Sequence, residues 1–97
     1  MRVIARKTLR DFWLKHRDAE QPLKAWFREA EAAQWKSPHA VKLQYRSASV
    51  VGSSRVVFNI AGNKYRLVVR FNFALGIAFI RFIGTHAQYD RIDVEVI

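Results

Sequence analysis

The sequence contains no cysteine among its 97 residues. This absence excludes a disulfide scaffold, a cysteine-ligated zinc or iron–sulfur centre and a cysteine nucleophile. The opening residues 1–7 also lack the run of about 7 to 15 apolar residues that a signal peptide needs. The longest uncharged stretch, residues 71–80, has about half the length that a membrane-spanning helix requires. We therefore expect a cytoplasmic protein with no transmembrane segment.

Acidic residues are scarce as well. The chain has 8 Asp and Glu against 17 Lys and Arg, which leaves a formal net charge of +9. Such an excess is typical of proteins that bind nucleic acid, although charge alone does not identify the partner. Hydrophobic residues make up 51% of the chain, so enough apolar side chains are present to fill one core. The length corresponds to a single domain over residues 1–97.

The N-terminal half has the period of two amphipathic helices. A short apolar segment, residues 2–5, precedes a first helix that we expect to begin at Thr8, because Asp11 completes the pattern of a capping box. Pro22 suits the first turn of a second helix. The apolar positions recur at helical spacing, with Leu9, Phe12, Trp13 and His16 in the first helix and Leu23, Trp26, Phe27 and Ala30 in the second.

These stripes also predict the environments of the tryptophans. Trp13 and Trp26 lie on the stripes and are expected in the core, whereas Trp35, near a helix end, is free to be exposed. The Ser-Pro pair at residues 37–38 can open a further helical turn, and residues 40–45 fit either a short helix or an extended segment. Residues 46–54 are rich in Ser and Gly and are expected to form a loop.

From residue 55 onward the period changes to two, and β-branched and aromatic residues dominate. We predict three strands over residues 55–60, 64–73 and 77–83, which form an antiparallel meander. Their three-residue connections contain Gly or Asn for positive φ, and Asn63 is assigned this role. One face of the second strand is apolar and is expected to meet the helices, with Tyr65, Leu67, Val69, Phe71 and Phe73.

The opposite face of this strand bears Arg66 and Arg70 and is expected to be free, with Arg55 or Arg81 close by on neighbouring strands. Thr85 is expected to cap a helical turn, after which residues 94–97 end extended. The predicted class is therefore α+β, with a short N-terminal strand, two helices packed on one face of an antiparallel meander sheet and a short C-terminal element.

Two segments of the second half, residues 58–67 (FNIAGNKYRL) and 80–90 (IRFIGTHAQYD), resemble HigB toxins. These belong to the RelE/ParE superfamily of type II toxin–antitoxin systems. The resemblance covers most of the chain and is most specific over residues 57–93. It implies a RelE-like fold and an mRNA interferase, an endoribonuclease that cleaves mRNA on the translating ribosome. It also implies a HigA-like helix-turn-helix antitoxin as partner, and we expect no cofactor.

Cleavage of RNA without a metal ion needs a proton acceptor for the 2′-hydroxyl, a proton donor for the leaving 5′ oxygen, and cations for the pentavalent phosphorane. Arg66 and Arg81 are the candidates for a phosphate clamp, because a guanidinium binds two phosphate oxygens at once. His86 and Tyr89 are the acid–base candidates, three residues apart and hence on one side of a helical turn. In the alternative reading the arginines are solvated, His86 caps the turn and Tyr89 packs on the sheet. The general base is left unassigned.

Four further residues are candidates for RNA contacts, namely Asn59, Lys64, Arg70 and Arg55. Asn59 could instead bond a neighbouring strand, and Lys64 could be a solvated hairpin charge. The three histidines are scattered along the chain, so no metal site is expected.

Two other functions remain open at this point. A ParE-like gyrase inhibitor would share the fold but would need no acid–base pair, because its target is a protein. A non-catalytic protein that binds RNA or the ribosome would have the same excess of positive charge. The antitoxin, in turn, could lie across the basic sheet face or on a remote helix face.

Overall fold

The computed structural model describes residues 1–97 and is built on one five-stranded sheet. The elements follow in the order β1 (Arg2–Ile4), α1 (Arg6–Lys15), the 3₁₀ turn η1 (Arg17–Ala19), α2 (Glu20–Ala32), α3 (Pro38–Gln44), β2 (Ser49–Val51), β3 (Arg55–Ile60), β4 (Tyr65–Asn72), β5 (Ile77–Thr85) and α4 (His86–Tyr89). The strand order is β1-β5-β4-β3-β2, with β1 parallel to β5 and all other neighbours antiparallel. The predicted α+β class is confirmed.

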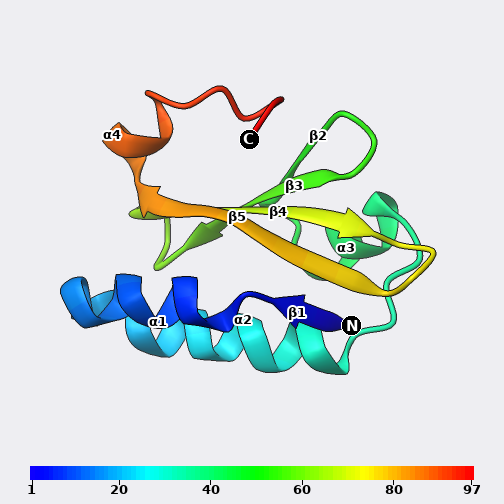
Figure 1. Ribbon diagram of the computed structural model, residues 1–97, viewed down its shortest axis with the longest axis horizontal. Helices are drawn as coiled ribbons and strands as arrows, with labels where there is room; N and C mark the ends of the chain where they lie inside the picture. Colours follow the sequence, from blue (N-terminus) through cyan, green and yellow to red (C-terminus); the bar gives the residue numbers. More distant parts are fainter.

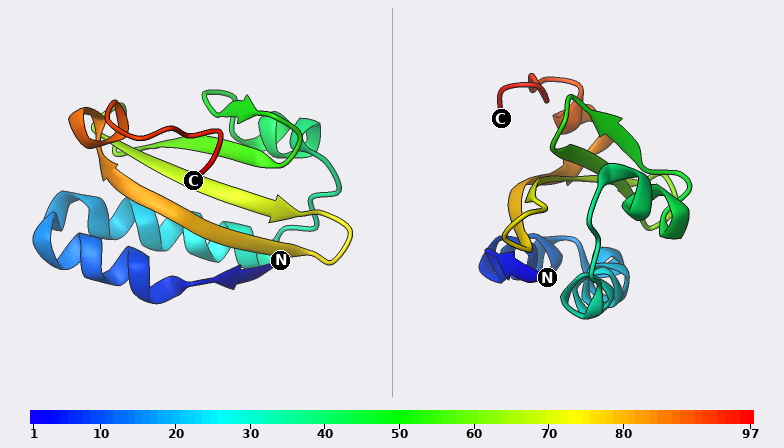
Figure 2. Two further views of the ribbon diagram at one scale, coloured as in Figure 1. Left: turned by 45° about the horizontal axis from the view of Figure 1, so that its top comes forward. Right: turned by 90° about the vertical axis from the view of Figure 1, so that its right-hand side faces the viewer.

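Helices α1 and α2 cover one face of the sheet, here called the inner face, whereas α4 and residues 90–97 lie on the other, the outer face (Figures 1 and 2). The helix stripes and the apolar residues of β3 and β4 meet in one buried cluster on the inner face. Within it Trp26 packs edge-on against Phe58, with ring centroids 5.3 Å apart. Burial of a side chain such as Phe58 stabilises the fold by roughly 1.5–3 kcal/mol. No helix has the length and apolar content of a membrane span.

Helix α1 begins earlier than the sequence pattern predicts. Its N-cap is Ala5, with no side-chain hydrogen bond, and the Thr8 amide donates to the Ala5 carbonyl over 3.2 Å. The expected capping box of Thr8 and Asp11 is therefore wrong. The chain passes directly from β1 into the helix, and the Asp11 carboxylate accepts instead from Lys7 one turn before it, over 2.7 Å. Pro22 lies in the first turn of α2, as predicted.

Trp35 is buried, with 5% of its surface exposed, which contradicts its expected exposure. The segment at residues 40–45, left open between helix and strand, belongs to α3, whose N-cap Ser37 accepts from the Ala40 amide over 3.2 Å. This helix folds back beside Trp35, and the indole donates to Gln44 over 3.1 Å. The ring of Trp35 also packs edge-on against Phe71. Trp35 is buried because α3 packs beside it, and the spacing of apolar residues in α2 does not predict the path of α3.

The three-stranded meander is confirmed, although its connections differ in detail. Residues 46–54, expected as a loop, contain β2, which pairs with β3. In the first hairpin the positive φ values belong to Ala61 (54°) and Gly62 (69°), not to Asn63. The two-residue left-handed stretch ends before Asn63, so this asparagine is not the residue that makes the turn. Strand β5 continues to Thr85, two residues beyond its expected end.

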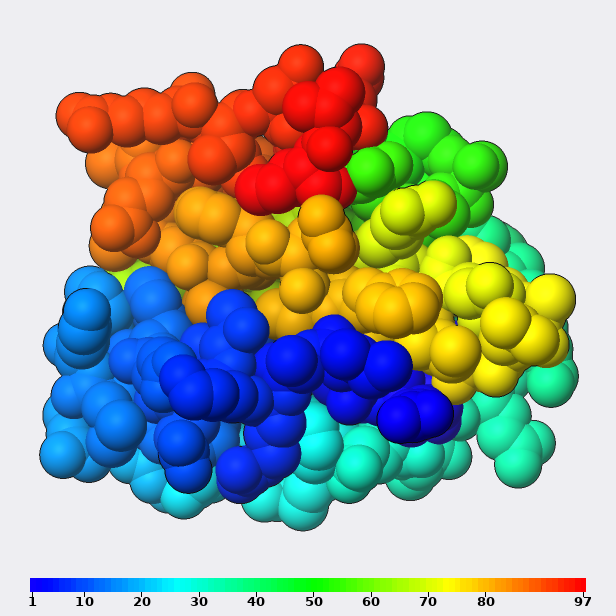
Figure 3. All heavy atoms as spheres, viewed as in Figure 1, coloured from blue at the N-terminus to red at the C-terminus, as the bar shows by residue number.

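The outer face is partly covered, which contradicts the expectation that it would be free. Val57 and its cross-strand partner Val68 lie on this face and are buried, at 4% and 0% exposure, yet neither belongs to the inner core cluster. Residues 90–97 cross the face, and residues 94–96 form a turn, with the Val96 and Ile97 amides donating to the Asp93 carbonyl, so the expected extended end is wrong. The Ile97 carbonyl accepts from Nε of Arg55 over 2.9 Å. In Figure 3 the C-terminal residues (red) lie directly against atoms of the sheet. Apolar side chains at the centre of the face explain this cover.

Candidate active site

The register of β3, β4 and β5 places Arg66 beside the start of α4. Arg66 lies on the outer face, opposite Asn59 on β3 and Gly84 on β5. The chain leaves β5 one residue after Gly84 and enters α4 at His86. Arg66 is half-buried, and its guanidinium donates to the Asn63 carbonyl over 3.2 Å. A cation and a histidine-bearing turn therefore share one end of the sheet.

Helix α4 is short and is stabilised by a complete capping box. The Thr85 hydroxyl accepts from the Gln88 amide over 3.2 Å, and the Gln88 side chain accepts from the Thr85 amide over 2.9 Å. The predicted cap at Thr85 is confirmed. Gly84 leaves room for this cap, since a Cβ there would lie 2.5 Å from Cζ of Phe82 and 2.7 Å from Oε1 of Gln88, so that one of these side chains would have to shift. These contacts fix the direction in which α4 leaves the sheet.

Within α4, His86 and Tyr89 present their polar groups differently. Nδ1 of His86 lies 3.2 Å from Oδ2 of Asp90, and both side chains are more than half exposed. When Nδ1 donates its proton to this carboxylate, Nε2 has a free lone pair that faces away from it. Tyr89 is half-buried with its ring 6.5 Å from that of Phe82, and its hydroxyl forms no hydrogen bond within the chain. Both groups are available to an outside ligand.

Arg81 is the extra residue of a β-bulge. Val68 pairs with Phe82 and Val69 pairs with Ile80, so that Arg81 has no partner on β4. It is exposed and forms no ion pair. Bulges redirect side chains and increase the local twist of a strand. Arg81 thus lies on the same strand as Gly84, at a point where the backbone is irregular.

Arg55 and Arg70 form a second basic region, separate from Arg66. They face each other across β3 and β4, and Arg70 is four residues from Arg66, about 13 Å along the strand. Arg70 is exposed, whereas Arg55 is half-buried and donates to the carbonyl of Ile97. Asn59 donates to the Ser47 carbonyl over 3.1 Å, so its side chain bonds the chain's own loop.

Lys64 lies in an ion pair with Asp18, which also accepts a hydrogen bond from the buried Tyr65 hydroxyl. The hydrogen bond from Lys64, followed by that from Tyr65, lowers the pKa of Asp18 below its ordinary value. The same bonds raise the pKa of Lys64 and of Tyr65. His16 packs edge-on against Tyr65, with ring centroids 5.4 Å apart. This network joins the segment after α1 to the first hairpin, and in it the charge of Lys64 is paired with that of Asp18.

Three residues that contribute to these contacts were not assigned from the sequence, and only two of them had a signal in it. Asp90 lies four residues after His86, the spacing at which helical side chains meet, so this pair had a local signal. Gln88 lies three residues after Thr85, the capping-box spacing. Asp18 had none, because it is 46 residues from Lys64 in the sequence.

The order of helices and strands defines the class of protein. A small basic α+β domain with two helices under a twisted antiparallel sheet, a parallel N-terminal strand and a short C-terminal helix has a RelE-like fold. A family model described as HigB_toxin, the RelE-like toxic component of a toxin–antitoxin system, matches residues 19–92. This is well over half of the chain, and the chain belongs to this family. No curated protein matches the sequence.

Proposed function

We propose that the chain is a ribosome-dependent mRNA interferase, an endoribonuclease that cleaves messages during translation. Family membership makes it the toxic component of a toxin–antitoxin system. The observation that supports catalysis is the position of α4, which brings His86 and Tyr89 to the end of the sheet where Arg66 lies opposite Gly84. Proton-transfer groups beside a guanidinium are the minimum that phosphoryl transfer without a metal ion requires.

The proposed reaction is attack of the 2′-hydroxyl on the adjacent phosphorus. Nε2 of His86 takes the 2′-hydroxyl proton, and the 2′ oxygen forms a new bond to phosphorus. The bond to the 5′ oxygen breaks, and Tyr89 donates the proton that this leaving group needs. The products are a 2′,3′-cyclic phosphate and a free 5′-hydroxyl. Arg66 and Arg81 neutralise the charge that develops on the phosphorane oxygens.

The remaining basic residues of the outer face have a supporting role in this proposal. Arg70 is exposed and can contact RNA phosphates directly. Arg55, Asn59 and Lys64 are bonded within the chain, and for them an RNA contact requires exchange of the bonds to Ile97, Ser47 and Asp18. The partners are mRNA and ribosomal RNA in the cytoplasm, and a HigA-like antitoxin that neutralises the toxin.

The test is a cell-free translation reaction that receives the purified chain, with message 5′ ends mapped by primer extension. Naked message and an Arg81→Gln variant serve as controls. New 5′ ends that require both ribosomes and Arg81 are the expected result. Intact message in every lane would contradict the proposal. Gyrase supercoiling assays and salt-dependent RNA binding would then decide between a ParE-like inhibitor and a non-catalytic RNA-binding protein.

A further inference from the structure

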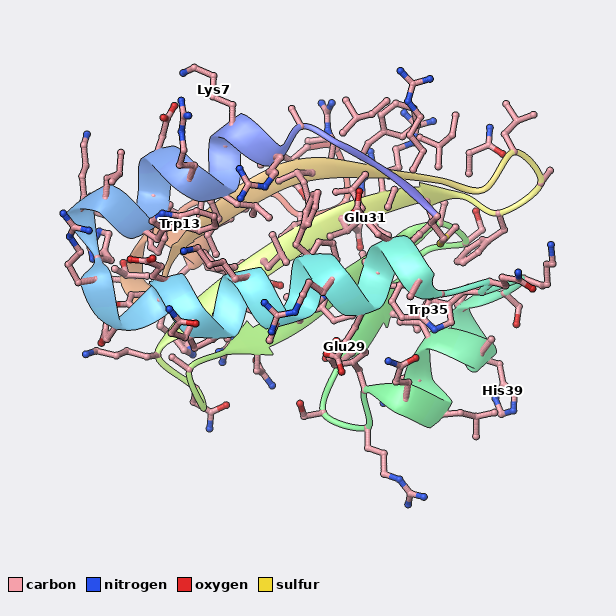
Figure 4. All side chains as sticks on the ribbon, turned by 90° about the horizontal axis from the view of Figure 1, so that it is seen from below. Lys7, Trp13, Glu29, Glu31, Trp35 and His39 are labelled. Atoms are coloured by element: carbon pink, nitrogen blue, oxygen red, sulfur yellow. The ribbon has the colours of Figure 1, made fainter.

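A pocket of about 260 Å³ lies between α1 and α2, in the helical layer that covers the inner face. It is lined by Arg6, Trp13, Lys24, Phe27, Arg28 and Glu31. Figure 4, which views this layer from outside, shows Trp13 between the two helices and Glu31 further along α2. None of these residues belongs to the candidate active site, which lies on the opposite side of the sheet. The pocket therefore needs a separate explanation.

Arg6 is held at this pocket by two aromatic rings. Its guanidinium carbon lies 5.4 Å from the ring centroid of Trp13 and 5.4 Å from that of Phe27. It forms no ion pair and no side-chain hydrogen bond within the chain. Cation–π contacts with both rings restrict the side chain while its five N–H donors stay free. A ligand that accepts these hydrogen bonds therefore meets a preorganised group and loses less entropy on binding.

The charges around the pocket are only partly paired. Lys24 lies over the Trp13 ring at 5.3 Å and is bonded to Glu20 over 2.6 Å, so its charge is satisfied. Arg28 and Glu31, one turn apart on α2, take part in no ion pair. The pocket thus offers two free guanidiniums and one free carboxylate to a ligand.

This combination fits a protein better than RNA. The ring of Trp13, which is only 5% exposed, is already in contact with two cations and cannot stack on a base. Tryptophan and arginine around a small pocket are typical of the central residues of protein interfaces. A carboxylate next to an apolar side chain would satisfy the guanidiniums and contact Phe27.

We infer that this pocket binds an aspartate or glutamate side chain of the antitoxin, held by Arg6 and Arg28. The inference rests on the antitoxin partner that the family implies, and not on RNA cleavage. Charge complementarity supports it, because the two unpaired guanidiniums of the pocket outnumber its one free carboxylate and favour an acidic partner side chain. It assigns the helical layer to partner recognition and leaves the outer face for the proposed chemistry.

The test measures the affinity of the purified cognate antitoxin for wild-type toxin and for Arg6→Gln and Arg28→Gln variants by calorimetry. A lost hydrogen-bonded ion pair weakens binding by about 10- to 100-fold, which is the expected effect of each substitution. Arg10→Gln is the matched control, because Arg10 is exposed on α1, the helix of Arg6, and does not line the pocket. Its affinity is expected to stay within about threefold of wild type, as for surface substitutions away from a contact.

Glu31→Gln gives a result of opposite sign, which misfolding cannot imitate. Removal of this carboxylate from a pocket that binds a carboxylate is expected to tighten antitoxin binding. Wild-type affinity in both arginine variants would overturn the inference, and so would a weaker complex with Glu31→Gln. If the arginine variants lose ribosome affinity while antitoxin binding is unchanged, the inference is also overturned and the pocket contacts RNA. Each of these results is independent of whether the chain cleaves mRNA.

Discussion

Nδ1 of His86 lies 3.2 Å from Oδ2 of Asp90, one helical turn later in the chain. The carboxylate orients the imidazole without burying it, because both side chains are more than half exposed. The pair connects a residue of the proposed chemistry to one that only positions it. The two roles predict different responses to substitution.

Replacement of His86 by Gln is expected to lower the cleavage rate on the ribosome by about 10²- to 10⁴-fold, the usual contribution of a general acid or base. Asp90→Asn is expected to cause a smaller fall, up to about 100-fold, because a misplaced ring loses rate without losing its function. Asp90→Glu should restore part of the rate. Single-turnover cleavage of a programmed ribosome measures all three, with Asp93→Asn as a neighbouring control. Equal losses for Asp90→Asn and Asp93→Asn would exclude a specific role of the pair.

Arg66→Gln and Arg81→Gln are each expected to reduce cleavage by about 10²- to 10³-fold, as for loss of one group that stabilises transition-state charge. Ribosome affinity is expected to change little, since many other phosphate contacts remain. Arg66→Lys should not restore the rate, because an ammonium lacks the planar fork of a guanidinium. Arg91→Gln, an exposed arginine outside the sheet, is the matched control. A parallel loss of binding and cleavage would show that these arginines only attach the protein to RNA.

Gly84→Ala tests the position of α4. The new Cβ would meet Cζ of Phe82 and Oε1 of Gln88, and the latter bonds the Thr85 amide. Displacement of Gln88 removes half of the capping box, so we expect a stability loss of about 1 kcal/mol together with a large loss of cleavage. Thr85→Ala removes the other half and should have a similar effect. Urea denaturation gives the stability, and the cleavage assay gives the rate. Full cleavage activity in Gly84→Ala would show that cleavage does not depend on the position of α4.

The ion pair of Asp18 and Lys64 predicts a pH dependence of stability. The lowered pKa of Asp18 stabilises the fold above the ordinary value of 3.8, and this stabilisation is lost as the pH falls through the lower folded value. The raised pKa of Lys64 stabilises the fold below the ordinary value of 10.5, and that part is lost as the pH rises through the higher folded value. A double-mutant cycle of Asp18→Asn and Lys64→Met should therefore show a coupling near neutral pH that disappears in strong acid.

The coupling is measured by urea denaturation of the four proteins at pH 6 and at the lowest pH at which the wild type stays folded. Tyr65→Phe in the same background separates the second hydrogen bond to Asp18 from the first. A coupling that stays constant as the pH falls would show that the contact does not depend on the Asp18 charge.

Several parts of the fold that follow from local patterns were predicted correctly. The alternation in β4 depends only on which residues are apolar, and it identified both faces of the sheet. The cap at Thr85 depends on two residues three positions apart, Thr85 and Gln88, and it too is present. The cap at Thr8 failed because α1 begins at Arg6, which places Thr8 inside the first turn of the helix. A local cap signal thus depends on where the helix begins, and here the helix follows directly on β1.

Other features depend on residues far apart in the chain. β1 pairs with β5, Asp18 pairs with Lys64, and Arg55 bonds the last residue described, Ile97. No window of the sequence contains both partners of any of these contacts. The cover over Val57 and Val68 is of the same kind, since an apolar residue on a strand does not show what will bury it. The candidate site shares this limit, because sequence spacing could suggest His86 and Tyr89 but not place Arg66 beside them.

The parallel pairing of β1 with β5 sets an order on folding during synthesis. Arg2 pairs with Ile77, so the first strand has no partner until most of the chain has left the exit tunnel. Until then β1 has no strand to pair with, and α1 lacks the complete sheet face that it covers. The complete sheet, and with it the outer face, therefore forms only after β5 has left the tunnel, although β1 is synthesised first. A nascent toxin of this design therefore has no complete candidate site while β5 is still inside the ribosome that it is proposed to attack.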